Sequence, residues 1–226
     1  MTTLMTTPDY DHIDAVLAAL VAPTDDALDH ALSTSADGGL PAIQVAPVQG
    51  RLLEILAHAI GAKTILEVGT LGGYSTIRLA RGVGEGGKVT TLELNEHHAE
   101  VARENFSYAG VADRVDVMVG PALDTLSRLA TEGYGPVDMV FIDADKPNNA
   151  NYLRYGLQFA HAGTLLVVDN VVRGGSVAQD PLPDDNARGA YDAIAFMANE
   201  PRIDATALQL VGAKGHDGLA IGLVTA

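Results

Sequence analysis

The chain of 226 residues contains no cysteine and no tryptophan, and aromatic residues make up only 5% of it. Without cysteine there is no disulfide, no thiolate ligand for a metal ion and no thiol nucleophile. No apolar run approaches the roughly 20 residues that span a bilayer, and residues 1–8 lack the basic region and apolar core of a signal peptide. We therefore expect a cytoplasmic protein with no membrane partner.

Positive charge is scarce as well. The 14 Lys and Arg residues stand against 29 Asp and Glu residues, which gives a formal net charge of -15. A protein of this charge repels the phosphate backbone of nucleic acids along any broad surface. We therefore expect a small-molecule substrate and no nucleic-acid partner.

Hydrophobic residues are plentiful, at 47% of the chain, and charged residues make up only 19%. This composition supports a sizeable core, and the lack of a linker-like segment predicts one domain over residues 1–226. Helical spacing in three early segments predicts an N-terminal helical cap within residues 1–62 of that domain. These helices are expected over residues 10–21, 24–33 and 48–60.

From residue 64 the pattern becomes an alternation of strands and helices with short connections. Such alternation predicts a doubly wound, Rossmann-like α/β fold with a mostly parallel sheet. At the C-terminal end a helix is followed by two strands, which predicts an antiparallel hairpin at the sheet edge. Strands are expected at 64–69, 88–94, 114–119, 137–143, 164–169, 206–211 and 218–224, and helices at 73–82, 95–109, 121–131, 148–160 and 187–199.

A glycine-rich turn follows the first of these strands, in the run Ile-Leu-Glu-Val-Gly-Thr-Leu-Gly-Gly-Tyr-Ser at 65–75. About two dozen residues later the second strand carries Glu93, in the position where an acid receives ribose hydroxyls in nucleotide-type sites. The turn lacks the spacing G-x-G-x-x-G of dinucleotide sites, and Glu67 would repel a pyrophosphate. S-adenosylmethionine, which carries a cationic sulfonium and amine but no phosphate, fits better than NAD. A turn that only packs strand against helix would explain the glycines but not the two acids.

Acidic residues gather at the ends of two further strands. Phe-Ile-Asp143-Ala-Asp-Lys146 ends one strand, and Leu-Leu-Val-Val-Asp169-Asn170 ends another. Strand ends of an open α/β sheet meet at the ligand crevice, so the oxygens of Asp143, Asp169 and Asn170 would suit Mg²⁺, Mn²⁺ or Ca²⁺. Helix capping is the alternative use of these residues. Lys146 would either pair with a carboxylate or take a proton, unless it is an exposed loop lysine.

Taken together, these stretches resemble the cation-dependent O-methyltransferases of the caffeoyl-CoA and catechol type, especially their bacterial members. The resemblance spans about residues 40–224 and includes Gly120-Pro-Ala-Leu and the closing Lys214-Gly-His-Asp-Gly-Leu. It implies a class I S-adenosylmethionine-dependent methyltransferase fold, a homodimer, and methyl transfer to a vicinal-dihydroxy aromatic acceptor.

The resemblance also implies roles for individual residues. Lys146 would act as the base, or as an electrostatic aid, at the acceptor hydroxyl. A divalent ion, most readily Mg²⁺, would be held by Asp143, Asp169 and Asn170. The S-adenosylmethionine site would be lined by Ile43, Val45, Glu67, Gly69, Thr70, Ser75, Glu93, Ala122, Asp143, Asp145 and Tyr152, with Ile43 and Val45 closing over the cofactor.

Two departures from the family put the acceptor in doubt. The chain has no Trp to grip a phenolic ring, and residues 171–186 form a loop rich in Gly and Pro that either recognises the acceptor or merely connects two elements. Two rival functions remain at this point. One is a metal-independent methyltransferase with the same cofactor, and the other is a binding protein that keeps the pocket without turnover.

Overall fold

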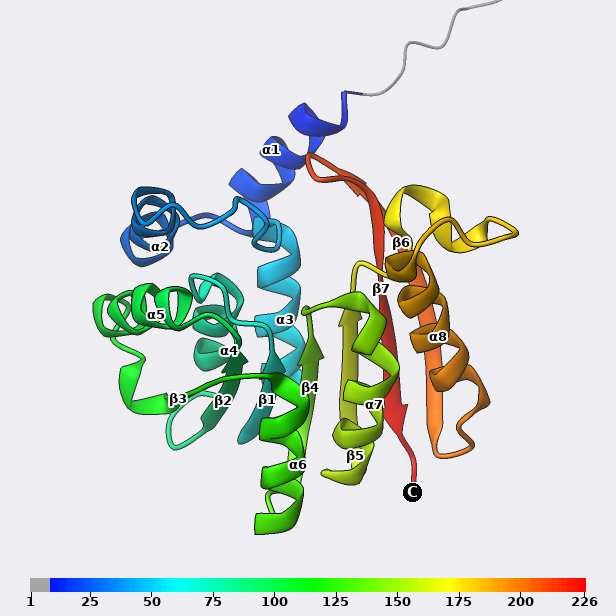
Figure 1. Cartoon of the computed structure of the whole chain (residues 1–226). Helices are drawn as coiled ribbons and strands as arrows, with labels where there is room; N and C mark the ends of the chain where they lie inside the picture. Colours follow the sequence, from blue (N-terminus) through cyan, green and yellow to red (C-terminus); the bar gives the residue numbers. More distant parts are fainter. Residues whose placement is uncertain (1–8) are drawn as a thin grey trace, which may run out of the picture.

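The computed structural model describes residues 9–226, and the expectation that residues 1–8 carry no signal peptide lies outside them. A seven-stranded sheet with the order β3-β2-β1-β4-β5-β7-β6 forms the centre of the molecule (Figure 1). The first five strands run parallel, and only β7 opposes its neighbours β5 and β6. The strands are β1 (Thr64–Val68), β2 (Lys88–Glu93), β3 (Val115–Val119), β4 (Val137–Ile142), β5 (Ala160–Asp169), β6 (Ile203–Gly212) and β7 (Gly215–Val224).

Helices cover both faces of the sheet, which explains why its central strands are apolar on both sides. In β4, Met139 and Phe141 face one core, whereas Val140 and Ile142 face the other. The first core is closed by α2 (Asp26–Asp37), α3 (Pro47–Ala59), α4 (Tyr74–Gly82) and α5 (Glu96–Tyr108), and the second by α6 (Ala122–Glu132), α7 (Asn149–Gln158) and α8 (Asp185–Asn199). The expected doubly wound fold is therefore confirmed.

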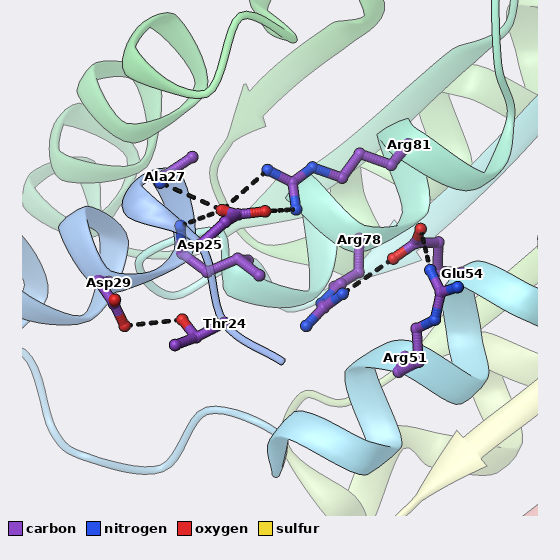
Figure 2. Close-up of polar contacts among 9 residues, drawn as sticks. Thr24, Asp25, Ala27, Asp29, Arg51, Glu54, Arg78 and Arg81 are labelled. Carbon is purple, nitrogen blue, oxygen red and sulfur yellow. Dashed lines mark hydrogen bonds and ion pairs between the residues drawn. The ribbon is translucent and has the colours of Figure 1, made fainter. Parts of the chain in front are cut away.

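The N-terminal helices are tied to α4, the helix that follows the glycine-rich turn (Figure 2). Asp25 caps α2 and pairs with Arg81 at 2.7 Å, and Glu54 of α3 bonds the buried guanidinium of Arg78 at 3.0 Å. The remaining helix, α1 (Tyr10–Val21), lies beside the β6–β7 turn, where Asp14 accepts a hydrogen bond from the backbone of Ala213. These contacts tie α2 and α3 to the middle and last turn of α4, and α1 to the C-terminal hairpin.

The C-terminal hairpin is confirmed, but its strands are longer than the sequence indicates. Pairing is continuous from Ile203 opposite Val224 to Gly212 opposite Gly215, so the connection is two residues long instead of 213–217. Gly218 lies inside β7, where a Cβ atom would approach the carbonyl oxygen of Leu208 to 2.3 Å. This glycine therefore marks a close approach of two strands and not a turn.

Other boundaries differ by a few residues. Residues 160–163, expected as the end of a helix and a connection, begin β5, and the loop after β5 contains tight turns over Arg173–Ala178 that are interrupted by left-handed backbone at Gly174 and Gly175. Within residues 9–226, no helix is long and apolar enough to cross a membrane.

Candidate active site

A cavity of about 860 Å³ opens beyond the carboxyl ends of β1, β2 and β4. Its walls come from the glycine-rich turn, α2, residues 41–45 and the start of α6. The place agrees with the rule that ligands of open α/β sheets bind outside the carboxyl ends of the strands. Most of the residues expected at the site line this cavity, namely Ile43, Val45, Gly69, Thr70, Ser75, Glu93, Ala122, Asp143, Asp145, Lys146, Tyr152 and Asn170.

The glycine-rich turn brings the ends of β1 and β4 together. Gly69 has a φ of 101°, and a Cβ atom on it would lie 2.3 Å from the carbonyl oxygen of Asp143. Gly73 precedes α4 with a φ of 83°, and its missing side chain leaves room for the ring of Phe106. Neither position accepts a side chain without displacing a neighbour.

Glu93 holds the turn from the neighbouring strand. Its carboxylate accepts hydrogen bonds from the backbone N–H groups of Thr70 at 3.2 Å, Leu71 at 2.8 Å and Asn95 at 2.9 Å. His98 lies 3.5 Å from the same carboxylate and lines the cavity, a position that the sequence did not reveal.

Glu67 lies beneath the cavity and does not line it. The carboxyl is fully buried and accepts hydrogen bonds from the hydroxyls of Ser75, Thr76 and Thr91. Burial raises the pKa of Glu67 to about 7, although the three hydroxyl donors oppose this rise. Since Thr91 also bonds the Thr70 hydroxyl at 2.6 Å, Glu67 reaches the cavity wall only through its neighbours.

The acidic cluster is present at the tips of β4 and β5. Lys146 is buried and donates from Nζ to Oδ1 of Asp143 at 2.7 Å. Asp169 is 2% exposed, and burial together with the charge of Asp143 raises its pKa to about 7. Burial lowers the pKa of the Lys214 ammonium in the β6–β7 turn, and the negative charges of Asp143 and Asp169 oppose this shift. The carboxylates of Asp143 and Asp169 are thus held close together, and the nearby lysines neutralise their charge only in part.

The donor set decides which ion this cluster suits. Residues 9–226 contain no group of three or more His, Cys, Asp or Glu side chains that would hold a metal ion. The candidate set consists of two carboxylates and one amide, Asp143, Asp169 and Asn170, and the like charges at the two strand tips favour a cation between them. Such all-oxygen donors fit a hard divalent ion better than zinc or copper.

Asp145 and Tyr152 form a second polar pair on the cavity wall. The Tyr152 hydroxyl donates to Oδ1 of Asp145, and Asn148 donates to the other oxygen at 2.6 Å. Burial and the charge of Asp145 raise the pKa of Tyr152 well above its ordinary value. The phenol therefore stays protonated and fixes the carboxylate in place.

Strained backbone is concentrated around the cavity. Among residues 9–226, three residues other than glycine have positive φ angles, Leu71 at 52°, Asn170 at 58° and Arg173 at 52°. All three line the cavity. Left-handed conformations cost energy for residues with a side chain, and they cluster at functional sites. Arg173 was not among the expected site residues, because φ is not visible in a sequence.

Comparisons with known proteins identify the family. The family model described as O-methyltransferase matches residues 22–221. A catechol O-methyltransferase of Mycobacterium tuberculosis is 50% identical, with 96% of this chain and 97% of that protein covered. The crystal structure of an O-methyltransferase from Bacillus cereus with SAH is 44% identical with a TM-score of 0.93, covering 96% of this chain and 98% of that one.

An O-methyltransferase involved in tomaymycin synthesis in Streptomyces achromogenes, solved with SAM, is 39% identical with a TM-score of 0.92; 96% of this chain and 97% of that chain are covered. A Eucalyptus globulus caffeoyl-CoA O-methyltransferase is 35% identical over 59% of this chain and 54% of that protein. The family resemblance found in the motifs is thereby confirmed, and the chain belongs to the O-methyltransferase family.

Proposed function

We propose that this protein transfers the methyl group of S-adenosylmethionine to a hydroxyl of a small vicinal-dihydroxy aromatic acceptor, with the help of a divalent metal ion. The observation that carries the proposal is one cavity with two unlike ends. The glycine-rich turn and Glu93 form one end, and Lys146, Asp143 and Asn170 form the other, with Asp169 buried behind them. A methyl donor and an acceptor hydroxyl would meet between them.

The cofactor proposal rests on charge and on two relatives. Glu93, Asp145 and Asp143 line the cavity, and these carboxylates would repel a pyrophosphate but tolerate a sulfonium and an amine. The Bacillus cereus and Streptomyces achromogenes enzymes were solved with SAH and SAM. Backbone donors orient the Glu93 carboxylate, and its remaining lone pairs would receive ribose hydroxyls. Glu67 would act indirectly, by fixing Ser75 on the wall.

Asp143, Asp169 and Asn170 would hold the metal ion, with Mg²⁺ as the first choice and Mn²⁺ or Ca²⁺ as alternatives. When bound, the ion supplies Lewis acidity that lowers the pKa of the acceptor hydroxyl. Lys146 sits at 2.7 Å from Asp143 at this end of the cavity. As a donor the Lys146 ammonium would stabilise the phenolate, and in its neutral form Lys146 would take the proton of the hydroxyl.

Methyl transfer is an in-line displacement in which a carbon–oxygen bond forms as the carbon–sulfur bond breaks. The main contribution of the protein is to position the methyl donor and the acceptor hydroxyl, because they must approach to about 3 Å in the right orientation. Val45 is buried and Ile43 is 67% exposed at the rim, so both are placed to exclude water from the cofactor. The acceptor's proton leaves toward Lys146.

Three further features belong to the proposal. The whole chain would act as a single methyltransferase domain, because the N-terminal helices contribute Ala31, Leu32 and Ser35 to the cavity wall. The enzyme would work in the cytoplasm. It would form a homodimer, which the apolar stripe on α1 supports: Ile13, Val16, Leu17 and Leu20 are all exposed.

The first test separates metal from cofactor. Asp169→Ala should lower kcat/KM by more than about 100-fold, because the Lewis acid is worth several kcal/mol. Its affinity for S-adenosylmethionine, measured by calorimetry, should stay near that of the wild type. Glu93→Ala should weaken cofactor affinity instead. Asp184→Ala, which removes the N-cap of α8 outside the cavity, is the control for losing an acidic side chain.

Excess EDTA tests the rival functions in the same assay, with labelled cofactor and a panel of catechols. An unchanged methylation rate in EDTA would support a metal-independent enzyme and contradict the metal site. Cofactor binding without transfer to any acceptor, with each of Mg²⁺, Mn²⁺ and Ca²⁺, would support a binding protein. Equal losses of cofactor affinity in Asp169→Ala and Glu93→Ala would contradict the assignment of Asp169 to the metal ion and Glu93 to the cofactor.

A further inference from the structure

The turn after β5 contains three consecutive residues in the left-handed region. Their φ angles are 52° at Arg173, 63° at Gly174 and 87° at Gly175. Glycine adopts this conformation without strain, whereas an L residue with a long side chain does so at a cost. The second and third positions are glycine, but the first is arginine. The left-handed backbone at Arg173 therefore marks this residue as a candidate functional position.

The backbone of this turn is held from β7. Oδ1 of Asp217 accepts hydrogen bonds from the N–H groups of Val172 at 3.1 Å and Arg173 at 2.9 Å. The carbonyl of Arg173 in turn accepts a hydrogen bond from the Ser176 hydroxyl at 2.8 Å. With its backbone fixed on both sides, Arg173 is half-buried and lines the active-site cavity together with Lys146 and Asn170.

The guanidinium of Arg173 lacks an ion-pair partner among residues 9–226. Lys146, the other lysine or arginine on the cavity wall, is already paired with Asp143. A free guanidinium in a cavity is unexpected in a chain of net charge -15, where carboxylates are abundant. It leaves one positive charge available for an anionic ligand.

We propose that Arg173 is a specificity-determining residue that binds a carboxylate carried by the aromatic acceptor, an inference that rests on the proposed function. Arg173 and the proposed metal ligand Asn170 both line the cavity and lie three residues apart in the same loop, which associates Arg173 with the acceptor end. A planar guanidinium binds a carboxylate through two parallel hydrogen bonds, which fixes orientation as well as charge. The acceptor class is therefore a dihydroxyaryl carboxylate in place of a neutral catechol.

The matched substrates are 3,4-dihydroxybenzoate and its methyl ester, which have the same ring and hydroxyls but differ in charge. The quantity measured is the ratio of kcat/KM for the acid to that for the ester, with S-adenosylmethionine and Mg²⁺. Arg173→Met should lower this ratio by about 10- to 100-fold, mainly through the KM of the acid, because a charge-assisted hydrogen-bond pair is lost. Arg173→Lys keeps the positive charge but loses the paired N–H groups of the guanidinium, so its ratio should fall between those of the wild type and Arg173→Met.

Arg188→Met is the control, because Arg188 is exposed on α8 and outside the cavity, and its loss changes the net charge equally. Its ratio should equal that of the wild type. Caffeoyl-CoA serves as a third substrate, since the guanidinium could bind the phosphate oxygens of its CoA group instead of a carboxylate. A ratio unchanged by Arg173→Met, or a loss confined to the CoA thioester, would overturn the inference. If neither the acid nor the ester is methylated by the wild type, it is the proposed function that fails.

Discussion

The carboxyl of Glu67 is completely buried between β1 and α4, where three hydroxyl groups surround it. Its pKa of about 7, against an ordinary 4.5, means that the folded protein holds a proton that the unfolded chain releases between these values. Stability from this group is therefore lost as the pH rises from 4.5 through 7. Once the carboxyl is ionised in both the folded and the unfolded state, the raised pKa of Glu67 lowers the free energy of unfolding by about 3 kcal/mol.

Glu67→Gln should remove this dependence, because the amide is neutral at every pH. The unfolding free energy of the variant relative to the wild type should increase by about 2 to 3 kcal/mol between pH 5 and pH 8. Urea unfolding in EDTA at both pH values measures the change. The exposed Glu85→Gln reports the effect of removing one negative charge alone. Parallel pH curves for wild type and Glu67→Gln would show that the carboxyl titrates near its ordinary pKa.

Single residues also show where sequence reasoning ends. The sequence indicated acids at the carboxyl ends of β1, β2, β4 and β5, and the structure brings Glu93, Asp143 and Asp169 to one edge of the sheet. It misplaced the carboxyl of Glu67, because the alternation of strand side chains turns this residue toward α4. It missed Arg173, because a left-handed backbone in a residue other than glycine leaves no mark in the composition.

At the scale of elements, the site depends on how closely β1 approaches β4. Gly69 allows this approach because it has no side chain. A methyl group there would collide with the backbone of Asp143, which cannot move aside as a flexible side chain could. Asp143 is a proposed metal ligand and the partner of Lys146. The packing of one glycine is thus linked to the position of the acidic cluster.

Gly69→Ala should therefore abolish methyl transfer and lower the melting temperature strongly. Gly133→Ala is the matched control, because Gly133 also has a positive φ, 76°, but open space around its Cα. Its cost should be limited to backbone strain of about 1–2 kcal/mol. Differential scanning calorimetry and the methylation assay compare the two. Equal effects of the two substitutions would mean that the contact with Asp143 does not matter.

Elements were predictable wherever the hydrophobic pattern was strong. Each expected strand and helix of the sheet has a counterpart, because buried parallel strands and amphipathic helices have distinct periods. The hairpin was predicted too short, since Gly215 and Gly218 both suggest turns while only Gly215 makes one. The tight turns over Arg173–Ala178 were missed, because left-handed turns depend on tertiary hydrogen bonds such as those from Asp217.

The whole molecule leaves one apolar surface without a partner in the described chain. Helix α1 has no buried residue, yet Ile13, Val16, Leu17 and Leu20 follow the i, i+3, i+4, i+7 spacing of an apolar face. The helix is anchored through Asp14, which flanks this face, to the β6–β7 turn that contains Lys214. A second copy of the chain that covers this face would therefore also brace the acceptor end of the site.

Leu17→Glu with Leu20→Glu should convert the proposed dimer to a monomer, because two buried charges without partners are costly at an interface. Ala15→Glu with Ala19→Glu adds the same charges to exposed positions away from this stripe and should leave the dimer intact. Light scattering coupled to gel filtration measures the mass of each variant. A wild-type protein of 23.5 kDa in solution would contradict the dimer directly. If the leucine variant is monomeric and also slower, the interface supports the acceptor end as its link to Asp14 suggests.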